Sequence, residues 1–284
     1  MKKLALISDV HGNYKALEAF LEYIEAHPVD GIICLGDYVT DSPYPERTMD
    51  LLYQMRKEHE CYMIHGNRED YLLDNVGNKA GWKPSSANGT LYYTLQHMRP
   101  EDFAFFKTLP TERELRIQGC PVLYLCHGTP GRVRGNVHEE EGLKEKVLKE
   151  LPYPYLLGGH SHHQEIDSMY GKTYINPGSL GFAVDNVGRH AQFAILTGVS
   201  EKWEPAFLSI PYDVDGYLRA FSESGVDEFG MVLNRAIKKS LVTGVNYFYH
   251  CILAMEKEAK EAGVGAIDQM PESAWEKLAE RFEL

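Results

Sequence analysis

Short apolar runs that stop at polar or glycine-rich segments mark the N-terminal part of the sequence. Residues 3–8, 32–35 and 61–64 each hold an unbroken apolar stretch, and each stretch predicts a short buried strand. Polar residues with glycine follow every one of these runs. The regular recurrence of such runs indicates successive strands of one sheet.

Two stretches with helical spacing separate these predicted strands. The first, expected over 14–27, carries apolar residues at i, i+3, i+4 and i+7, namely Leu17, Phe20, Leu21 and Ile24. Pro45 suits the first turn of the second helix, which carries Leu51, Leu52 and Met55 on one side. Strands and helices that alternate in this way predict an α/β fold built on a layered sheet.

The pattern changes after the third strand. Residues 70–110 show no strand pattern and are expected to be helical and irregular, as a lid inserted into the fold. Strand-like runs then return at 115–117, 122–126, 155–157, 172–175, 191–196 and 207–210. From residue 213 the spacing is helical again, as in Trp275, Leu278, Ala279 and Phe282.

These patterns predict one large domain over 1–212 and a helical C-terminal extension over 213–284 packed on it. The chain has 284 residues, 44% of them hydrophobic, which is ample for one sizeable core, and no linker-like segment divides it. We expect the extension to serve as structural support or as a dimer contact, so a homo-oligomer is one possible state.

The composition of the chain limits the expected cellular location of the protein and its expected binding partners. No apolar run approaches the ~20 residues of a membrane helix, and the N-terminus lacks a signal peptide, so a cytoplasmic protein is expected. Five cysteines without a Cys-x-x-Cys pair predict reduced thiols. Lysine and arginine number 29 against 41 acidic residues, a net charge of −12. Such a surface repels polyanions, which argues against general nucleic-acid or membrane binding but still permits a small phosphate-containing substrate.

Candidate chemistry recurs where the predicted strands end. Metal-ligand residue types follow five strand-like runs: Asp9 and His11, Asp37, Asn67, His127, and His160 with His162. The carboxyl ends of strands share one edge of an open α/β sheet, so these side chains are expected to meet there. Imidazole mixed with oxygen ligands suits Mn or Fe, with Zn possible, and seven ligands suit two ions ~3.5–4 Å apart.

These motifs resemble those of the calcineurin-like metallophosphoesterases. The resemblance rests on Asp9-x-His11, Gly36-Asp37, Gly66-Asn67, His127-Gly128 and Gly159-His160-Ser161-His162. It spans about residues 1–212 and is nearest to the bacterial predicted-phosphoesterase branch, which includes diadenosine-tetraphosphatase-like enzymes. Asn176-Pro177-Gly178-Ser179 also looks like that branch.

The resemblance implies a four-layer α/β/β/α sandwich with two metal ions at one sheet edge. By position it places Asp9, His11 and His162 on the first ion and Asn67, His127 and His160 on the second. Asp37 would bridge the two ions, which would activate water for attack on phosphorus. The implied activity is hydrolysis of small phosphate compounds.

One residue departs from the family pattern. The position after Gly66-Asn67 usually holds a histidine that protonates the leaving group or stabilises the transition state, whereas here it is Arg68. Arginine stays charged near neutral pH, so it clamps a phosphoryl oxygen but is a poor proton donor. We therefore expect phosphoanhydrides or phosphodiesters, such as dinucleoside polyphosphates or nucleotides, to be preferred over alkyl monoesters. A surface salt bridge with Glu69 or Asp70 is the structural alternative for Arg68.

Further candidates come from the loops and the insertion. Asp37, Asn67 and Arg68 are the catalytic candidates, and Arg68 is expected to bind substrate together with Arg132 and Arg134. Trp82, Tyr92 and Tyr93 would either stack on a base or form the core of the insertion. Asp41 would either orient a ligand or cap a helix.

Two other functions remain open at this stage. A serine/threonine-type protein phosphatase would share the chemistry, but Asp41 is followed by Ser42-Pro43 instead of the Arg-Gly pair of those enzymes. A non-catalytic binding scaffold with the same fold is the other, although all seven ligand positions here hold suitable residue types.

Overall fold

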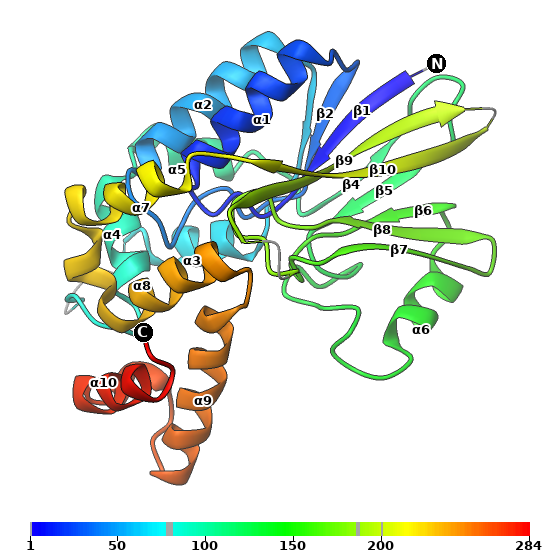
Figure 1. The fold of residues 1–284 in the computed structure, drawn as a ribbon. Coiled ribbons are helices and arrows are strands. Elements are labelled where there is room, and N and C mark those ends of the chain that lie inside the picture. The colour runs from blue at the N-terminus through cyan, green and yellow to red at the C-terminus, as the bar shows by residue number, and fades with distance from the viewer. Residues whose placement is uncertain (1, 78–81, 186–187, 200) are drawn as a thin grey trace.

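Two five-stranded sheets form the centre of the protein (Figure 1). The computed structural model describes residues 2–77, 82–185, 188–199 and 201–284. The strand order is β10-β9-β1-β2-β3 in the first sheet and β4-β5-β6-β8-β7 in the second. Both sheets mix parallel and antiparallel neighbours.

The first sheet contains the three strands expected at the N-terminus. Its strands are β1 (Lys2–Ile7), β2 (Gly31–Cys34), β3 (Cys61–Met63), β9 (His190–Val199) and β10 (Lys202–Pro211). The first three run parallel, and β9 pairs antiparallel with β1. The late strand β9 therefore lies beside the first strand of the chain, which the order of elements in the sequence does not reveal.

The second sheet differs from expectation at both edges. Its strands are β4 (Glu112–Leu115), β5 (Leu123–Cys126), β6 (Tyr155–Leu157), β7 (Gln164–Met169) and β8 (Lys172–Pro177). The strand expected at 115–117 lies three residues earlier, because β4 pairs in register with β5 from Glu112 to Leu115. The edge strand β7 was not predicted, since it is mostly polar and leaves Ile166 half exposed.

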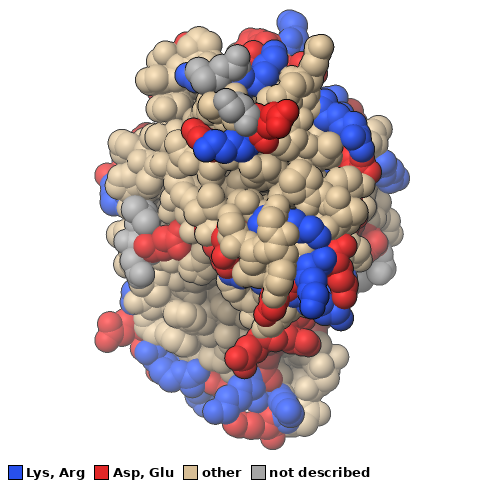
Figure 2. Space-filling view, turned by 90° about the vertical axis from the view of Figure 1, so that its right-hand side faces the viewer, with Lys and Arg blue, Asp and Glu red and all other residues tan. Residues whose placement is uncertain are grey.

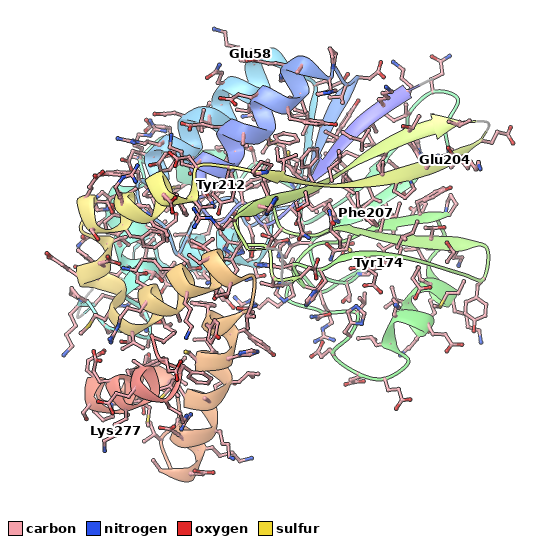
Figure 3. The ribbon with its side chains drawn as sticks, in the orientation of Figure 1. Glu58, Tyr174, Glu204, Phe207, Tyr212 and Lys277 are labelled. Carbon is pink, nitrogen blue, oxygen red and sulfur yellow. The ribbon has the colours of Figure 1, made fainter. Side chains whose placement is uncertain are left out.

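The layers follow the predicted α/β/β/α order. Helices α1 (Tyr14–Ala26) and α2 (Pro45–Glu58) cover the outer face of the first sheet (Figure 1). The unpredicted helix α6 (Leu143–Glu150) covers the outer face of the second sheet through Leu148. Apolar side chains of both sheets meet between them, with Phe207 of β10 packed against this central core (Figure 3). The expected fold class is confirmed.

The insertion is helical, as expected. It contains α3 (Asn67–Asn75), α4 (Gly89–His97) and α5 (Pro100–Phe106), and residues 78–81 of the predicted lid lie outside the described residues. Its rings contact one another and the C-terminal segment, since Trp82 lies against Tyr92 and Tyr93 against Phe229. These rings form the core of the insertion, which favours the packing alternative over a base platform.

The C-terminal segment folds as helices packed on the rest of the chain. They are α7 (Val214–Glu223), α8 (Val226–Thr243), α9 (Tyr247–Glu261), the short 3₁₀ helix Ile267–Gln269 and α10 (Glu272–Arg281). Tyr217 of α7 packs edge-on against Tyr14 of α1. Asn13, which caps α1, donates a hydrogen bond to the hydroxyl of Tyr212. Tyr212 follows β10 directly (Figure 3). None of the helices in the described ranges has both the length and the apolar character needed to cross a bilayer.

Candidate metal centre

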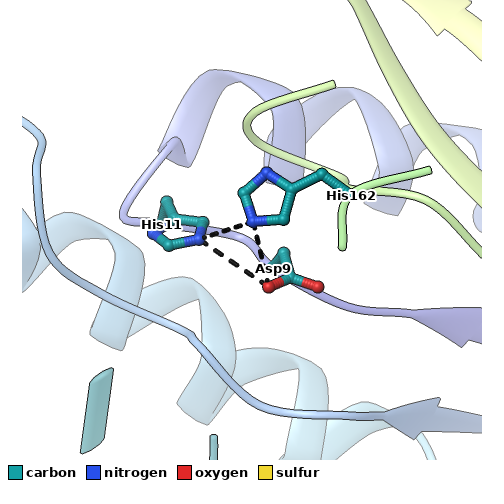
Figure 4. A group of neighbouring side chains, drawn as sticks. All are labelled: Asp9, His11 and His162. Atoms are coloured by element: carbon teal, nitrogen blue, oxygen red, sulfur yellow. Dashed lines mark hydrogen bonds and ion pairs between the residues drawn. The ribbon is translucent and has the colours of Figure 1, made fainter. Parts of the chain in front are cut away.

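The predicted ligands meet at one edge of the two sheets, in two groups. In the first group, ligand atoms of Asp9, His11 and His162 lie within 4.8 Å of one another (Figure 4). The second group brings together Asp37, His127 and His160 in the same way. Each group joins loops that follow strands of both sheets, so neither sheet alone supplies a complete set.

The first group is compact and buried. The Nε2 atoms of His11 and His162 lie 3.1 Å apart. Asp9 Oδ1 lies 3.2 Å from Nε2 of His162 and 3.7 Å from Nε2 of His11 (Figure 4). This oxygen is buried and has no hydrogen-bond partner among the described residues. An ionised oxygen that faces two imidazole nitrogens in this way is a suitable ligand for a cation.

The second group includes the amide of Asn67. Nε2 of His127 lies 3.4 Å from Asp37 Oδ2 and 3.1 Å from Asn67 Oδ1. The same Asp37 oxygen lies 3.7 Å from Nε2 of His11 in the first group. Asp37 thus stands between the two groups, as expected of a bridging carboxylate.

Backbone N–H groups orient both carboxylates. Oδ2 of Asp9 accepts a hydrogen bond from the His160 N–H at 3.0 Å, and Oδ1 of Asp37 accepts one from the Arg68 N–H at 2.8 Å. In each carboxylate the second oxygen then points toward the imidazoles. The arrangement fixes which oxygen of each residue is available to a cation.

Backbone carbonyls fix two of the imidazole rings. Nδ1 of His127 donates to the Leu35 carbonyl at 2.8 Å, and Nδ1 of His162 donates to the Phe182 carbonyl at 2.9 Å. A carbonyl oxygen only accepts, so Nδ1 carries the proton and, in the neutral ring, Nε2 presents a lone pair to the centre. The residues present therefore fit a pair of bound cations.

The charge states agree with this fit. Burial raises the pKa of Asp9, but the charges of His162 and His127 outweigh it, so the pKa lies well below the usual range. Burial, together with the charge of His127, lowers the pKa of His160 to about 4. Burial lowers the pKa of His127, yet Asp37 and Asp9 raise it to about 10, so in the absence of a cation His127 holds a proton beside the carboxylates. A cation would take the place of that proton.

Most ligand residues have an unusual backbone conformation. Positive φ values occur at Asp9, His11, Asp37, His160 and His162, between 45° and 65°. Residues other than glycine rarely adopt this left-handed conformation, and it costs of order 1–3 kcal/mol each. The strain turns each side chain away from its strand and toward the shared edge. Sequence patterns gave no sign of this feature.

Glu69 is a positioning residue that no motif in the sequence indicated. Its carboxylate is fully buried and accepts three backbone hydrogen bonds, from Gly66 and Tyr38 at 2.8 Å and from Asp37 at 2.9 Å. Burial and the nearby charge of Asp37 raise the pKa of Glu69 to about 7. Glu69 holds the loop that carries Asp37 against the loop that carries Asn67.

The segment Asn176–Ser179 connects the two sheets at the site. Asn176 donates to the Gly159 carbonyl at 2.8 Å and to the Ser161 hydroxyl at 3.0 Å. The Ser179 hydroxyl donates to the Asp9 carbonyl at 2.7 Å. This motif, noted above only as part of a resemblance, holds the loops of His160 and Asp9 in place.

The close approach of the two ligand loops requires glycine at position 66. A Cβ added to Gly66 would lie 2.2 Å from Asp37 Oδ1, although its φ of −102° is open to any residue. We expect Gly66→Ala to displace Asp37 and to lower metal-dependent hydrolysis by about tenfold or more. Gly77→Ala is the matched control because nothing lies within 4 Å of a Cβ there. Equal rates for the two variants would contradict this account.

Arg68 lies beside the centre and pairs with Asp41. Nη2 of Arg68 lies 3.1 Å from Asp41 Oδ2, while Nε lies 4.0 Å from Asp37 Oδ2. Asp41 also accepts a hydrogen bond from Thr90 of α4 at 2.7 Å. The expected alternative of a surface salt bridge with Glu69 or Asp70 is wrong, because Glu69 is turned inward and Arg68 pairs with Asp41. Asp41 is a positioning residue.

The two other arginines have different surroundings. Arg134 lines the cavity beside the ligand groups, and its guanidinium lies 4.2 Å from the Tyr71 ring. Arg132 is paired with Glu139 on the surface and is not among the described residues that line that cavity. The geometry therefore supports the substrate-binding prediction for Arg134 and gives no support for Arg132.

The cavity extends from the ligand groups to the C-terminal helices. Its volume is about 1170 Å³, and its lining includes Ile237 and Leu241 of α8 and Phe248 of α9. The C-terminal extension was expected to give structural support or a dimer contact. Because it lines the cavity beside the ligands, it contributes directly to the site.

Comparison with known proteins agrees with the geometry. Residues 1–201 match the family described as the calcineurin-like phosphoesterase superfamily domain. An uncharacterized protein of Methanocaldococcus jannaschii is 26% identical over 235 residues, which cover 74% of this chain and 88% of that protein.

Two solved structures have a similar fold. A hypothetical protein of Pyrococcus horikoshii gives a TM-score of 0.73 at 20% identity, covering 86% of this chain and 99% of the other. A metallophosphoesterase of Sphaerobacter thermophilus gives 0.65 at 22% identity, with the same coverage. Both similarities extend beyond residue 201, so they include part of the C-terminal helices.

Proposed function

The chain belongs to the calcineurin-like phosphoesterase superfamily and is a metal-dependent phosphoesterase, and from this premise we propose that it hydrolyses small phosphoanhydrides or phosphodiesters at a dinuclear metal site. The observation that carries the proposal is the pair of ligand groups, Asp9 with His11 and His162, and Asp37 with His127 and His160. Asn67 adds an amide oxygen to the second group. Dinucleoside polyphosphates and nucleotides are the substrates that we favour.

The ligand types favour Mn or Fe, with Zn possible, because imidazole and carboxylate are combined without a thiolate. Two bound cations would supply Lewis-acid activation of water and of the phosphoryl oxygens. The chain's own groups then have separate roles. The Asp9 and Asp37 carboxylates, the Asn67 amide and the four imidazoles of the two groups would hold the cations. The Arg68 guanidinium would stabilise charge that develops on the phosphoryl group.

The substrate preference rests on Arg68. Arg68 lies in the first turn of α3, where its pairing with Asp41 keeps it charged, so we expect it to be a poor proton donor to the leaving group. Leaving groups that need no proton should therefore react fastest. On the face of the protein shown in Figure 2, basic and acidic side chains are interspersed and form no broad basic patch. This face offers no binding surface for a polyanion, in keeping with a small substrate.

The test compares leaving groups on one enzyme preparation. With added Mn²⁺, diadenosine tetraphosphate and a bis-aryl phosphodiester should be hydrolysed at least about tenfold faster than a phosphoserine peptide, since only the last needs protonation. Metal content is measured on the same samples. A rate on the phosphoserine peptide equal to the rates on the other two substrates would favour the protein-phosphatase alternative. Protein without metal or activity would favour the scaffold alternative.

A further inference from the structure

The cavity is larger than a phosphoryl group needs. Its volume of about 1170 Å³ exceeds the ~300–1,000 Å³ typical of pockets for drug-sized ligands. The family match ends at residue 201, yet part of the cavity lining comes from Tyr217 and from residues of the segment 237–250. A substrate that is larger than a phosphoryl group would therefore contact the C-terminal helices.

Two arginine guanidinium groups line one part of the cavity, which we call the cationic wall. Arg68 and Arg134 both line it, and both guanidinium groups lie over the ring of Tyr71, at 5.8 Å and 4.2 Å. Arg134 forms no ion pair with a carboxylate among the described residues, so its charge is available to an anion. This part of the cavity suits the phosphate groups of the substrate.

Aromatic rings line another part of the cavity, which we call the aromatic wall. The Phe182 ring lies 5.7 Å from the His162 ring, and the Phe248 ring lies 6.3 Å from Phe182. Phe248 also lies 5.8 Å from the Arg68 guanidinium, so it borders the cationic wall. Tyr249 lines the same cavity and is 52% exposed. A continuous set of ring surfaces thus begins beside a metal-ligand histidine and continues to α9.

A polar group interrupts this aromatic wall. The Asn246 side-chain oxygen accepts a hydrogen bond from the Tyr249 N–H and caps α9. Its amide N–H donors are not used by that bond, and Asn246 lines the cavity. Rings together with a hydrogen-bond donor suit a heteroaromatic ring better than an aliphatic chain.

We propose that Phe182, Asn246, Phe248 and Tyr249 form a subsite for a planar aromatic ring carried by the phosphate substrate, of which a nucleobase is the leading kind. The proposal rests on the proposed function, because it takes the phosphate end to lie at the ligand groups. It assigns the C-terminal helices a role in substrate selection. The phosphate chemistry belongs to the matched domain, and recognition of the ring is shared between Phe182 of that domain and the C-terminal helices.

Equilibrium binding to the full-length protein tests the subsite without turnover. The ligands are AMP, phenyl phosphate and ribose 5-phosphate, which share a phosphate and differ in the ring. Wild-type protein should bind at least one ring-bearing ligand about five- to tenfold more tightly than ribose 5-phosphate, the low end expected for stacking. Tyr249→Ala and Phe248→Leu should reduce that ratio to about two or less.

Tyr170→Ala is the matched control, because Tyr170 is 55% exposed and does not line the cavity. It should keep the wild-type ratio. Equal affinity of the wild-type protein for all three ligands would overturn the subsite. It would also be overturned if Tyr249→Ala and Phe248→Leu both left the wild-type affinity ratio unchanged. Hydrolysis of the bis-aryl phosphodiester by the same samples reports separately on the proposed function, so the two proposals can fail independently.

Discussion

Asp37→Asn should lower metal-dependent hydrolysis on the order of a thousandfold, equivalent to about 4 kcal/mol of transition-state stabilisation. The substitution removes the charge that stands between the two ligand groups, 3.4 Å from His127 Nε2 and 3.7 Å from His11 Nε2. An amide has nearly the same shape, so the loops should keep their positions. Bound metal, measured by elemental analysis, should fall together with the rate.

A second buried carboxylate provides the control for Asp37. Asp102 is fully buried, accepts hydrogen bonds from Tyr53 and Arg99, and belongs to neither ligand group. Asp102→Asn should lower the unfolding temperature, yet the folded protein should keep its metal and its rate per molecule. If Asp37→Asn binds metal and turns over substrate like the wild type, the dinuclear site is wrong.

Arg68→Ala should lower kcat by about a hundredfold while leaving the metal content unchanged, because we expect Arg68 to contact the phosphoryl group and it belongs to neither ligand group. Arg68→Lys should recover only part of the rate, since an ammonium lacks the planar fork of the guanidinium. Removal of the arginine also leaves Asp41 buried without its cation, so a lower unfolding temperature is expected.

The variants Arg132→Ala and Arg68→His complete this experiment. Arg132 is an exposed arginine paired with Glu139, and its loss should change kcat by less than about twofold. Arg68→His restores a proton donor at that position and should raise the relative rate on alkyl monoesters. A hundredfold loss in Arg132→Ala, or an unchanged rate in Arg68→Ala, would reverse the roles given to the two residues.

The residues that gather at the sheet edge could be predicted from the sequence because each lies shortly after the end of a strand. The end of β1 fixes the place of Asp9, and the end of β5 fixes that of His127. Parallel neighbours then bring such residues together without any knowledge of side-chain positions. The alternation of strands and helices predicted only a layered α/β sheet, and the order of the four layers was implied by the resemblance to the calcineurin-like metallophosphoesterases.

Contacts between distant segments could not be predicted in this way. The role of Glu69 depends on its reach to the Asp37 and Tyr38 N–H groups in another loop. The placement of Phe248 in the cavity depends on how α8 and α9 pack on the sheets, which helical spacing alone does not determine. Strand β7 escaped prediction because an edge strand with one solvated face needs no regular apolar pattern.

Each ligand group combines residues that follow strands of both sheets, and this has a consequence for the synthesis of the protein. Strand β1 leaves the ribosome long before its neighbour β9, which begins at His190. At typical rates of translation, the edge of β1 that pairs with β9 stays unpaired for roughly ten to forty seconds. His160 and His162 also emerge long after Asp9. A nascent chain that ends before them holds two of the three residues of each ligand group, so a cation in the cell finds its complete site only after residue 162 has been made.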